Sequence, residues 1–172
     1  MKSLNELIAV LVTPHAPTQL WRTAPCGLID MSIDNQGRWF HQGSEITRLE
    51  MMKLFASVLN YSQGIYTLIT PSEKCQIQVA DVPFLIKTWT TYQLGTQSVI
   101  VCEDNLGRQW PICEQFPLIT KLYCGQVVPY LCLPNGLTAR IQRSVYYQWA
   151  DIAEQDSKGA YLNSANNRYY LC

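Results

Sequence analysis

The chain has 172 residues, and its 13 Lys and Arg against 13 Asp and Glu leave a formal net charge of zero. That length suits one compact body or two packed subdomains, and zero net charge excludes the basic character of a binder of nucleic acid or anionic membranes. Apolar residues make up 48% and charged residues 15%, which excludes disorder over most of the chain.

The first predicted element is an amphipathic N-terminal helix. Apolar residues recur at helical spacing from Leu4 to Leu11, and Ser3 and Glu6 have the spacing of a capping box. The apolar run is too short for a signal sequence or a membrane span. We expect a helix that docks on the core, followed by a linker with prolines that leads to Trp21.

The first half of the chain then predicts a hairpin, a helix and two further strands, over residues 28–41, 47–60, 66–70 and 76–79. Apolar and polar residues alternate in the first strand of the hairpin, and Asn35 to Gly37 provide its turn. Thr47 and Glu50 have capping-box spacing at the start of the helix.

The second half is mainly β, with strands predicted over residues 85–92, 98–102, 108–112, 127–133 and 137–141. Asn105 to Gly107 and Asn135-Gly136 are hairpin turns by composition. A last helix is expected over residues 143–154, and short strands follow it.

An internal repeat is indicated when Arg48 is aligned with Arg143, because both segments then have the order hairpin, Ile-x-Arg, helix, Gly-x-Tyr strand. The hairpin of residues 28–41 would thereby correspond to the hairpin around Asn135-Gly136. We interpret the chain as an α+β protein of two related subdomains, preceded by a helix and linker, with bounds 1–20, 21–85 and 86–172.

The seven cysteines predict neither a disulfide framework nor a metal site. They are odd in number, none forms C-x-x-C, and the chain has only two histidines. We expect all seven to be reduced thiols, mostly buried, in a cytoplasmic protein.

Two arginines and one acidic strand face are the polar features that need an explanation. Arg48 and Arg143 fall at the starts of the two predicted helices, where a cation opposes the helix dipole. Each is either a buried arginine that bridges to a carboxylate or to strand carbonyls, or a binder of an anionic ligand. Asp30, Ser32 and Asp34 share one face of their strand, which is solvated, turned toward a ligand, or a metal site.

No nucleotide or catalytic motif accompanies these residues. The chain lacks a Walker loop, G-x-G-x-x-G and G-x-S-x-G, which excludes the corresponding enzyme classes. Cys26, His41 and Asp30 are suitable residue types for thiol catalysis, and Asp30 with Glu73 for acid–base work, but spacing alone does not bring them together.

A series of motifs follows one order along the first half: PCGLIDMSI at 25–33, GRW at 37–39, GSEITR at 43–48, GIYTLITPSEK at 64–74 and DVPF at 81–84. In this order and spacing the chain resembles the bacterial family known as domain of unknown function 1285. Beyond residue 84 the resemblance rests on RSVYY at 143–147 and on the last tyrosines. Three positions depart from the family pattern, at Gln36, Glu45 and Val82.

The resemblance implies an α+β fold of two related subdomains, each a curved antiparallel sheet with a helix. It also implies a role in signalling or small-molecule sensing, with no assigned catalytic residue. We therefore expect a non-catalytic cytoplasmic module for a small anionic ligand, with its pocket in a groove between the subdomains and no metal or cofactor. The candidate ligand-binding residues are Asp30, Arg48, Glu73, Asp81 and Trp21. The alternatives are a hydrolase or transferase that uses a carboxylate or Cys26, and a protein-interaction module.

Overall fold

The computed structural model describes residues 3–172, so the first two residues of the predicted N-terminal segment lie outside it. The chain forms two compact units. The N-terminal unit consists of Pro14–Pro83 together with Pro134–Leu137, and the C-terminal unit contains the other described residues. The longest helix within residues 3–172 has 10 residues, and none of the helices there could cross a membrane.

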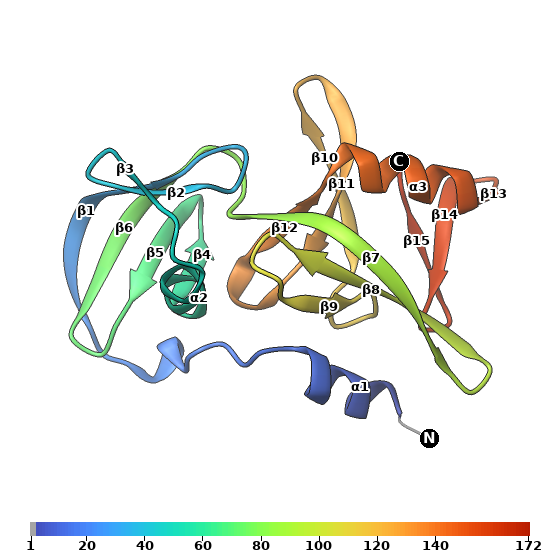
Figure 1. Ribbon diagram of the computed structural model, residues 1–172, viewed down its shortest axis with the longest axis horizontal. Helices are drawn as coiled ribbons and strands as arrows, with labels where there is room; N and C mark the ends of the chain where they lie inside the picture. Colours follow the sequence, from blue (N-terminus) through green and yellow to red (C-terminus); the bar gives the residue numbers. More distant parts are fainter. Residues whose placement is uncertain (1–2) are drawn as a thin grey trace. The chain divides into compact units, whose positions relative to one another are not determined.

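The N-terminal unit is a six-stranded sheet with one α-helix. Its elements are η1 (Thr18–Leu20), β1 (Ala24–Ile33), β2 (Trp39–His41), β3 (Ser44–Ile46), α2 (Leu49–Ser57), β4 (Leu59–Ser62), β5 (Ile65–Ile69) and β6 (Glu73–Val79). The strand order is β3-β2-β1-β6-β5-β4, and Figure 1 shows β1, β6, β5 and β4 side by side. The predicted hairpin and strands are confirmed. The helix is shorter than predicted because the chain enters β4 at Leu59.

Helix α2 covers the apolar face of this sheet. Ala56 of the helix is fully buried, and Phe55 stacks on Trp39 of β2 with ring centroids 6.0 Å apart. Ile33 and Leu59 are at most 1% exposed and complete the centre of the core. Burial of these large apolar groups is the main term that stabilises the unit.

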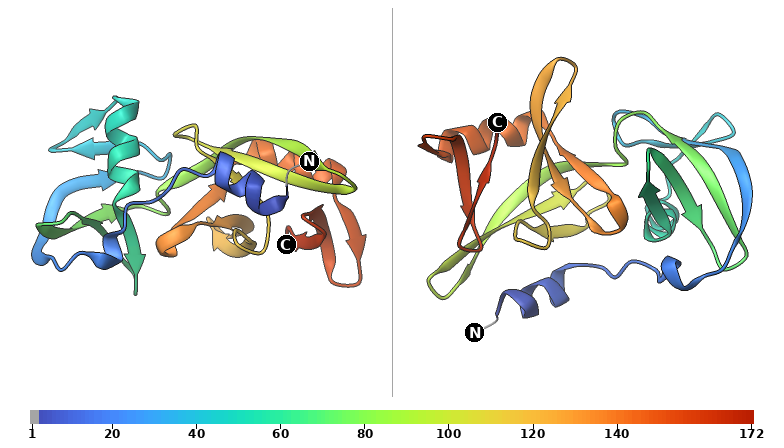
Figure 2. Two further views of the ribbon diagram at one scale, coloured as in Figure 1. Left: turned by 90° about the horizontal axis from the view of Figure 1, so that it is seen from below. Right: turned by 180° about the vertical axis from the view of Figure 1, so that it is seen from behind.

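The C-terminal unit holds a second six-stranded sheet, with two helices and a separate three-stranded sheet. Its elements are α1 (Leu4–Leu11), β7 (Phe84–Leu94), β8 (Gln97–Asp104), β9 (Gln109–Pro111), β10 (Leu118–Tyr123), β11 (Gln126–Cys132), β12 (Thr138–Ile141), α3 (Arg143–Ile152), β13 (Glu154–Asp156), β14 (Gly159–Ser164) and β15 (Asn167–Tyr170). The order of the large sheet is β10-β11-β12-β7-β8-β9. The β10–β11 hairpin extends beyond the rest of this sheet (Figure 2).

The N-terminal helix forms as predicted. The side chain of Ser3 accepts a hydrogen bond from the Glu6 amide, and the Glu6 carboxylate accepts one from the Ser3 amide. Leu7 is 4% exposed, and α1 packs against β9. The capping box thus fixes where the helix begins, and its apolar stripe fixes the face that docks.

The two large sheets have the same topology. If the strands of each are numbered one to six along the chain, both have the order 3-2-1-6-5-4. Strands one and six are parallel in both sheets, as β1 with β6 and β7 with β12, whereas the other neighbours are antiparallel. The fold is therefore α+β with two related halves, and each sheet is mixed rather than purely antiparallel.

The correspondence between the halves differs from the one expected. Helix α2 lies between strands three and four of its sheet, whereas α3 follows strand six. The hairpin β1–β2 corresponds by topology to β7–β8, not to the hairpin around Asn135-Gly136. The prediction that Arg48 and Arg143 occupy equivalent places is therefore wrong: the two helices share local sequence but not a position in the repeat.

The Asn135-Gly136 turn is confirmed, with φ of 64° and 74° at the two residues. It lies in a 3-10 turn (η2, Pro134–Gly136) between β11 and β12, and this turn packs against β4 within the N-terminal unit. A Cβ atom on Gly136 would collide with the carbonyl oxygen of Tyr61. Glycine is thus required there for both its positive φ and its lack of a side chain.

We expect Gly136→Ala to destabilise the N-terminal unit more than Gly64→Ala, the matched control. Gly64 has a φ of +82° and no atom within 4 Å of its added Cβ, so it carries only the conformational penalty of about 1 kcal/mol. The Tyr61 collision should add about 1–3 kcal/mol at Gly136. Denaturant unfolding measures both variants, and equal losses would show that the chain relaxes away from Tyr61 at no cost.

Candidate functional site

Three of the five predicted ligand-binding residues lie toward one end of the N-terminal sheet. Ile46, Trp39 and Ile33 are paired across β3, β2 and β1, and Ile33 is in turn paired with Val79 of β6. Arg48 follows β3 and Asp81 follows β6, so both lie beyond this end of the sheet. Three strand spacings separate their strands, about 14 Å. Asp30 lies on β1 three residues before Ile33.

The other two predicted residues lie at the opposite end. Glu73 begins β6 and is paired with Ala24, and Trp21 precedes β1. Asp30 lies between the pairs Leu28–Gln76 and Ser32–Gln78, and so about four residues of β6 from Glu73, which is about 13 Å along the strand. Carboxylates that share acid–base work lie within about 10 Å of each other. The geometry gives no support to these two as a catalytic pair.

Arg48 is the N-cap residue of α2 and is exposed. Its side chain makes no capping hydrogen bond, and among residues 3–172 no ion pair includes it. Arg143, the first residue of α3, is also exposed. The interpretation of either one as a buried bridging arginine is therefore wrong, which leaves the ligand-binding interpretation as a prediction for Arg48.

The surroundings of Arg48 favour an anion. The first amides of a helix generally lack a partner within the helix. In α2 the amides of Met51 and Met52 bond to the Arg48 carbonyl, and no N-cap side chain serves the amides before them. These amides carry the partial positive charge of the helix dipole, and the guanidinium adds a full charge. Glu50, in the first turn, is the nearest acidic residue of the helix.

Cys26 and Cys75 form a disulfide, so the prediction that all seven cysteines are reduced is wrong for these two in the state that the structure shows. They lie on the neighbouring parallel strands β1 and β6, with Cα atoms 5.1 Å apart. Sequence spacing could not show this, because 49 residues separate them. The other five cysteines are free, and Cys26 is not available as a thiol nucleophile in this state.

A β-bulge explains why the two sulfurs meet. Pro25 is paired with Lys74 and Gly27 with Cys75, so Cys26 is an extra residue in β1. Gly27 has a φ of +80°, which glycine adopts readily. A bulge redirects the side chain of its extra residue, and here it turns Cys26 toward β6.

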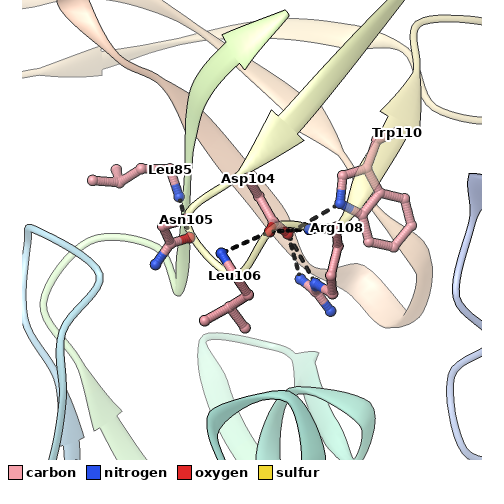
Figure 3. Close-up of polar contacts among 6 residues, drawn as sticks. All are labelled: Leu85, Asp104, Asn105, Leu106, Arg108 and Trp110. Atoms are coloured by element: carbon pink, nitrogen blue, oxygen red, sulfur yellow. Dashed lines mark hydrogen bonds and ion pairs between the residues drawn. The ribbon is translucent and has the colours of Figure 1, made fainter. Parts of the chain in front are cut away.

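A buried cluster of polar side chains lies in the C-terminal unit, at the β8–β9 turn (Figure 3). The Asp104 side chain is fully buried, and its Oδ1 accepts hydrogen bonds from the amides of Leu106 and Arg108. Its Oδ2 accepts from Arg108 Nε at 2.9 Å and from Trp110 Nε1 at 3.1 Å. The Arg108 Nη2 also lies 2.8 Å from Oδ2, as an ion pair.

Neighbouring groups enclose this cluster. The Arg108 guanidinium lies over the Phe84 ring at 4.1 Å and over the Trp110 ring at 5.1 Å from their centroids. The Asn105 side chain accepts a hydrogen bond from the Leu85 amide and so ties the turn to β7. The Arg108 Nη2 makes the ion pair but no hydrogen bond, whereas both turn amides, Arg108 Nε and Trp110 Nε1 all donate to Asp104. Because these donors serve the turn itself, we interpret the cluster as structural.

A related turn connects β1 and β2, and the two turns share a motif that the sequence analysis did not single out. Both turns read D-N-x-G-R, and Asp34 accepts from the amides of Gln36 and Arg38 and from Arg38 Nε. Partial burial opposes ionisation, but these bonds and the Arg38 charge together lower the pKa of Asp34. The motif occupies different connections in the two sheets, so it marks a recurring turn rather than the register of the repeat.

Two mixed sheets with one strand order define a two-domain α+β protein built on a repeated topology. Residues 16–82 match the model of the N-terminal domain of domain of unknown function 1285 (DUF1285), and residues 83–171 match the C-terminal domain of protein of unknown function DUF1285. The chain belongs to the DUF1285 family.

Two crystal structures of DUF1285 family proteins resemble this chain. The one from Silicibacter pomeroyi DSS-3 has 29% identity and a TM-score of 0.84, over 99% of this chain and 95% of that one. The one from Shewanella baltica OS155 also has 29% identity, with a TM-score of 0.59 over 72% of this chain and 91% of that one. Among curated proteins, none matches.

The D-N-x-G-R turns provide a matched pair of variants, Asp104→Asn and Asp34→Asn. Asparagine keeps the Oδ1 acceptor for the turn amides but replaces Oδ2 by a donor that faces arginine. Arg108 is 11% exposed, so its unpaired charge should cost about 3–5 kcal/mol. The Arg38 side chain is 57% exposed, so the loss of its ion pair with Asp34 should cost about 1 kcal/mol or less. Similar losses of unfolding free energy in the two variants would contradict a structural role that depends on burial.

Proposed function

We propose that this protein is a non-catalytic binding module for a small anionic ligand, and that Arg48 is the centre of the site. One observation carries the proposal: at the start of α2, which has no side-chain cap, stands the exposed Arg48, and it has no ion pair with any residue of the described segment 3–172. Guanidinium binds carboxylate and phosphate groups through two parallel hydrogen bonds. The helix amides next to it reinforce the preference for negative charge.

The acidic residues near the same end of the sheet restrict the ligand further. Asp81 is half-buried and already has a partner within the protein, whereas Asp30 is exposed, and its carboxylate would not help to bind a simple anion. Carboxylates instead accept hydrogen bonds from hydroxyl or amino groups. We therefore propose a small carboxylate or phosphate compound that also carries such groups. Trp21 and Glu73 lie about 20 Å away along the strands, too far for the same ligand.

A sensory role in the cytoplasm is the rest of the proposal. Cys124 and Cys172 are free and exposed, which suits a reducing compartment because exposed thiols pair readily in an oxidising one. Disulfides in cytosolic proteins are usually transient and sensitive to redox state. The link to signal transduction rests on the family resemblance alone.

A protein-interaction module is the second candidate, and α2 favours it. Leu49, Met51 and Leu54 are 42%, 38% and 63% exposed on this short helix. Met51 and Leu54 are three residues apart and therefore lie on the same side of α2, where exposed apolar side chains favour contact with a partner. If Arg48 served such a surface, small anions would not bind it with useful affinity.

We expect Arg48→Met to abolish ligand-induced thermal stabilisation without unfolding the protein. Methionine keeps the length of the side chain and removes only the charge, and substitution of an exposed residue changes stability by about 0.5 kcal/mol at most. The measurement is a thermal-shift screen against small carboxylate and phosphate compounds. A ligand at about 100 times its Kd should stabilise the wild type by about 2.7 kcal/mol.

Arg143→Met is the matched control, because Arg143 is also exposed at the start of a helix. A compound that stabilises the wild type and the control but not the Arg48 variant supports the site. A screen without any hit, or a hit that survives in the Arg48 variant, would remove the proposal and leave the interaction module.

The thiol count tests the proposed compartment. Purified protein, denatured without reductant, should react with a maleimide at five cysteines, since Cys26 and Cys75 are linked. In cells quenched with acid, we expect all seven to react, because a reducing cytoplasm keeps an accessible pair reduced. Five reactive thiols in quenched cells would place the protein in an oxidising compartment.

A further inference from the structure

Three groups with metal-binding chemistry meet where β1 and β6 begin. The sulfurs of Cys26 and Cys75 and a carboxylate oxygen of Glu73 all lie within 4.8 Å of one another. Glu73 and Cys75 are two residues apart on β6 and therefore share one face of the sheet. Cys26 joins them from β1 because of the bulge at Gly27. No other group of this kind occurs within residues 3–172.

We infer that reduction of the Cys26–Cys75 disulfide converts this corner into a binding site for a thiophilic divalent cation, Zn²⁺ by preference. Two thiolates and one carboxylate would bind the ion, and the fourth tetrahedral position would be open to water. This function is independent of the anionic ligand proposed at Arg48, which lies toward the opposite end of the sheet.

The donor set fits such an ion. Zn–S bonds of about 2.3 Å and Zn–O bonds of about 2.1 Å place tetrahedral ligands roughly 3.6–3.8 Å apart. The three groups already lie within 4.8 Å of one another, and the two Cα atoms are 5.1 Å apart. Rotation about the Cα–Cβ bonds is thus enough to separate the sulfurs after reduction. Thiolates select Zn²⁺ over Mg²⁺ and Ca²⁺, which prefer oxygen ligands.

Access and charge agree with this assignment. Cys26 and Glu73 are exposed, whereas Cys75 is 7% exposed and anchors the site to the core. Three groups that can carry negative charge repel one another when they ionise together. A divalent cation relieves this repulsion, so the metal stabilises the deprotonated form of both thiols.

The chemistry balances in two steps. A dithiol reductant transfers two electrons and two protons to the disulfide, which gives two protein thiols and leaves the reductant as its own disulfide. The cation then displaces the two thiol protons and forms two metal–sulfur bonds. Metal binding and disulfide formation use the same sulfur atoms, so each state excludes the other.

The test uses the full-length chain with Cys124→Ser and Cys172→Ser, which remove the free exposed thiols. Three free cysteines remain, of which Cys102 and Cys113 are buried and Cys132 is half-buried. Burial raises the pKa of the Cys102 and Cys132 thiols. The protein is reduced with a dithiol, freed of reductant without oxygen, and titrated with Co²⁺. Thiolate-to-cobalt charge-transfer absorption should saturate at one ion per chain, and Zn²⁺ should displace the Co²⁺.

Two comparisons decide the outcome. The oxidised form of the same chain should bind no Co²⁺. Glu73→Gln should bind Co²⁺ at least about tenfold more weakly, because loss of a residue that only hydrogen-bonds to a metal ligand already lowers metal affinity by about 10–100-fold. Glu73 is exposed, so this variant should fold. Binding without charge-transfer absorption, equal binding by the oxidised chain, or unchanged affinity in Glu73→Gln would each overturn the assignment.

A second variant locates the thiolates. Cys26→Ser removes one exposed sulfur and should abolish the charge-transfer band, whereas Cys132→Ser, on β11 of the other unit, should leave it unchanged. A band that persists in Cys26→Ser would assign the ion to other cysteines and overturn the proposal. Neither result depends on whether an anion binds at Arg48.

Discussion

In each half of this protein, the parallel pairing of the first and last strands joins the large sheet at its centre. Each large sheet consists of two three-stranded meanders, and only β1 with β6, or β7 with β12, holds them together. A parallel pair cannot be closed by a tight turn, so a long connection has to return the chain to the same end of the sheet. Buried residues of these strands, such as Ile33 on β1 and the paired Ile86 and Ile141, therefore make contacts between segments that are far apart in the sequence.

Both halves have this parallel pair, but they differ in the helices and loops that connect or follow their strands. Between strands three and four the N-terminal unit carries α2, whereas the C-terminal unit has a short connection with the bridge between Cys113 and Phe116. The C-terminal unit instead continues into α3 and the small sheet after its sixth strand. Arg48 stands at the start of a helix that connects two strands of its sheet. Among the described residues, the C-terminal sheet has no corresponding helix and therefore no counterpart of Arg48. A repeated scaffold carries different surfaces because the connections, not the strands, have diverged.

Local sequence features predicted local structure well, and the failures concern contacts between distant residues. Ser3 with Glu6 and Asn135-Gly136 specify a cap and a turn through their own hydrogen bonds and φ preferences. Strand β10 was missed because most of its residues are exposed on both faces, so no alternation of apolar and polar residues marks it. The Cys26–Cys75 pair and the burial of Asp104 depend on strand order, which no spacing along the chain encodes. For the same reason the sequence could not show whether Arg48 is a buried bridging arginine or an exposed one that binds an anion.

The disulfide makes a closed covalent ring of the segment from Cys26 to Cys75, which contains most of the N-terminal sheet and all of α2. A protease that cuts within the ring, for example at the exposed Gln42-Gly43 turn, would leave both pieces joined. Closing a loop of this length removes about 4 kcal/mol of chain entropy from the unfolded state in the simplest model. A cation held by the same two side chains would close the same ring by coordination. The ring would therefore stay closed when the disulfide is reduced, with a metal ion in place of the bond between the two sulfurs.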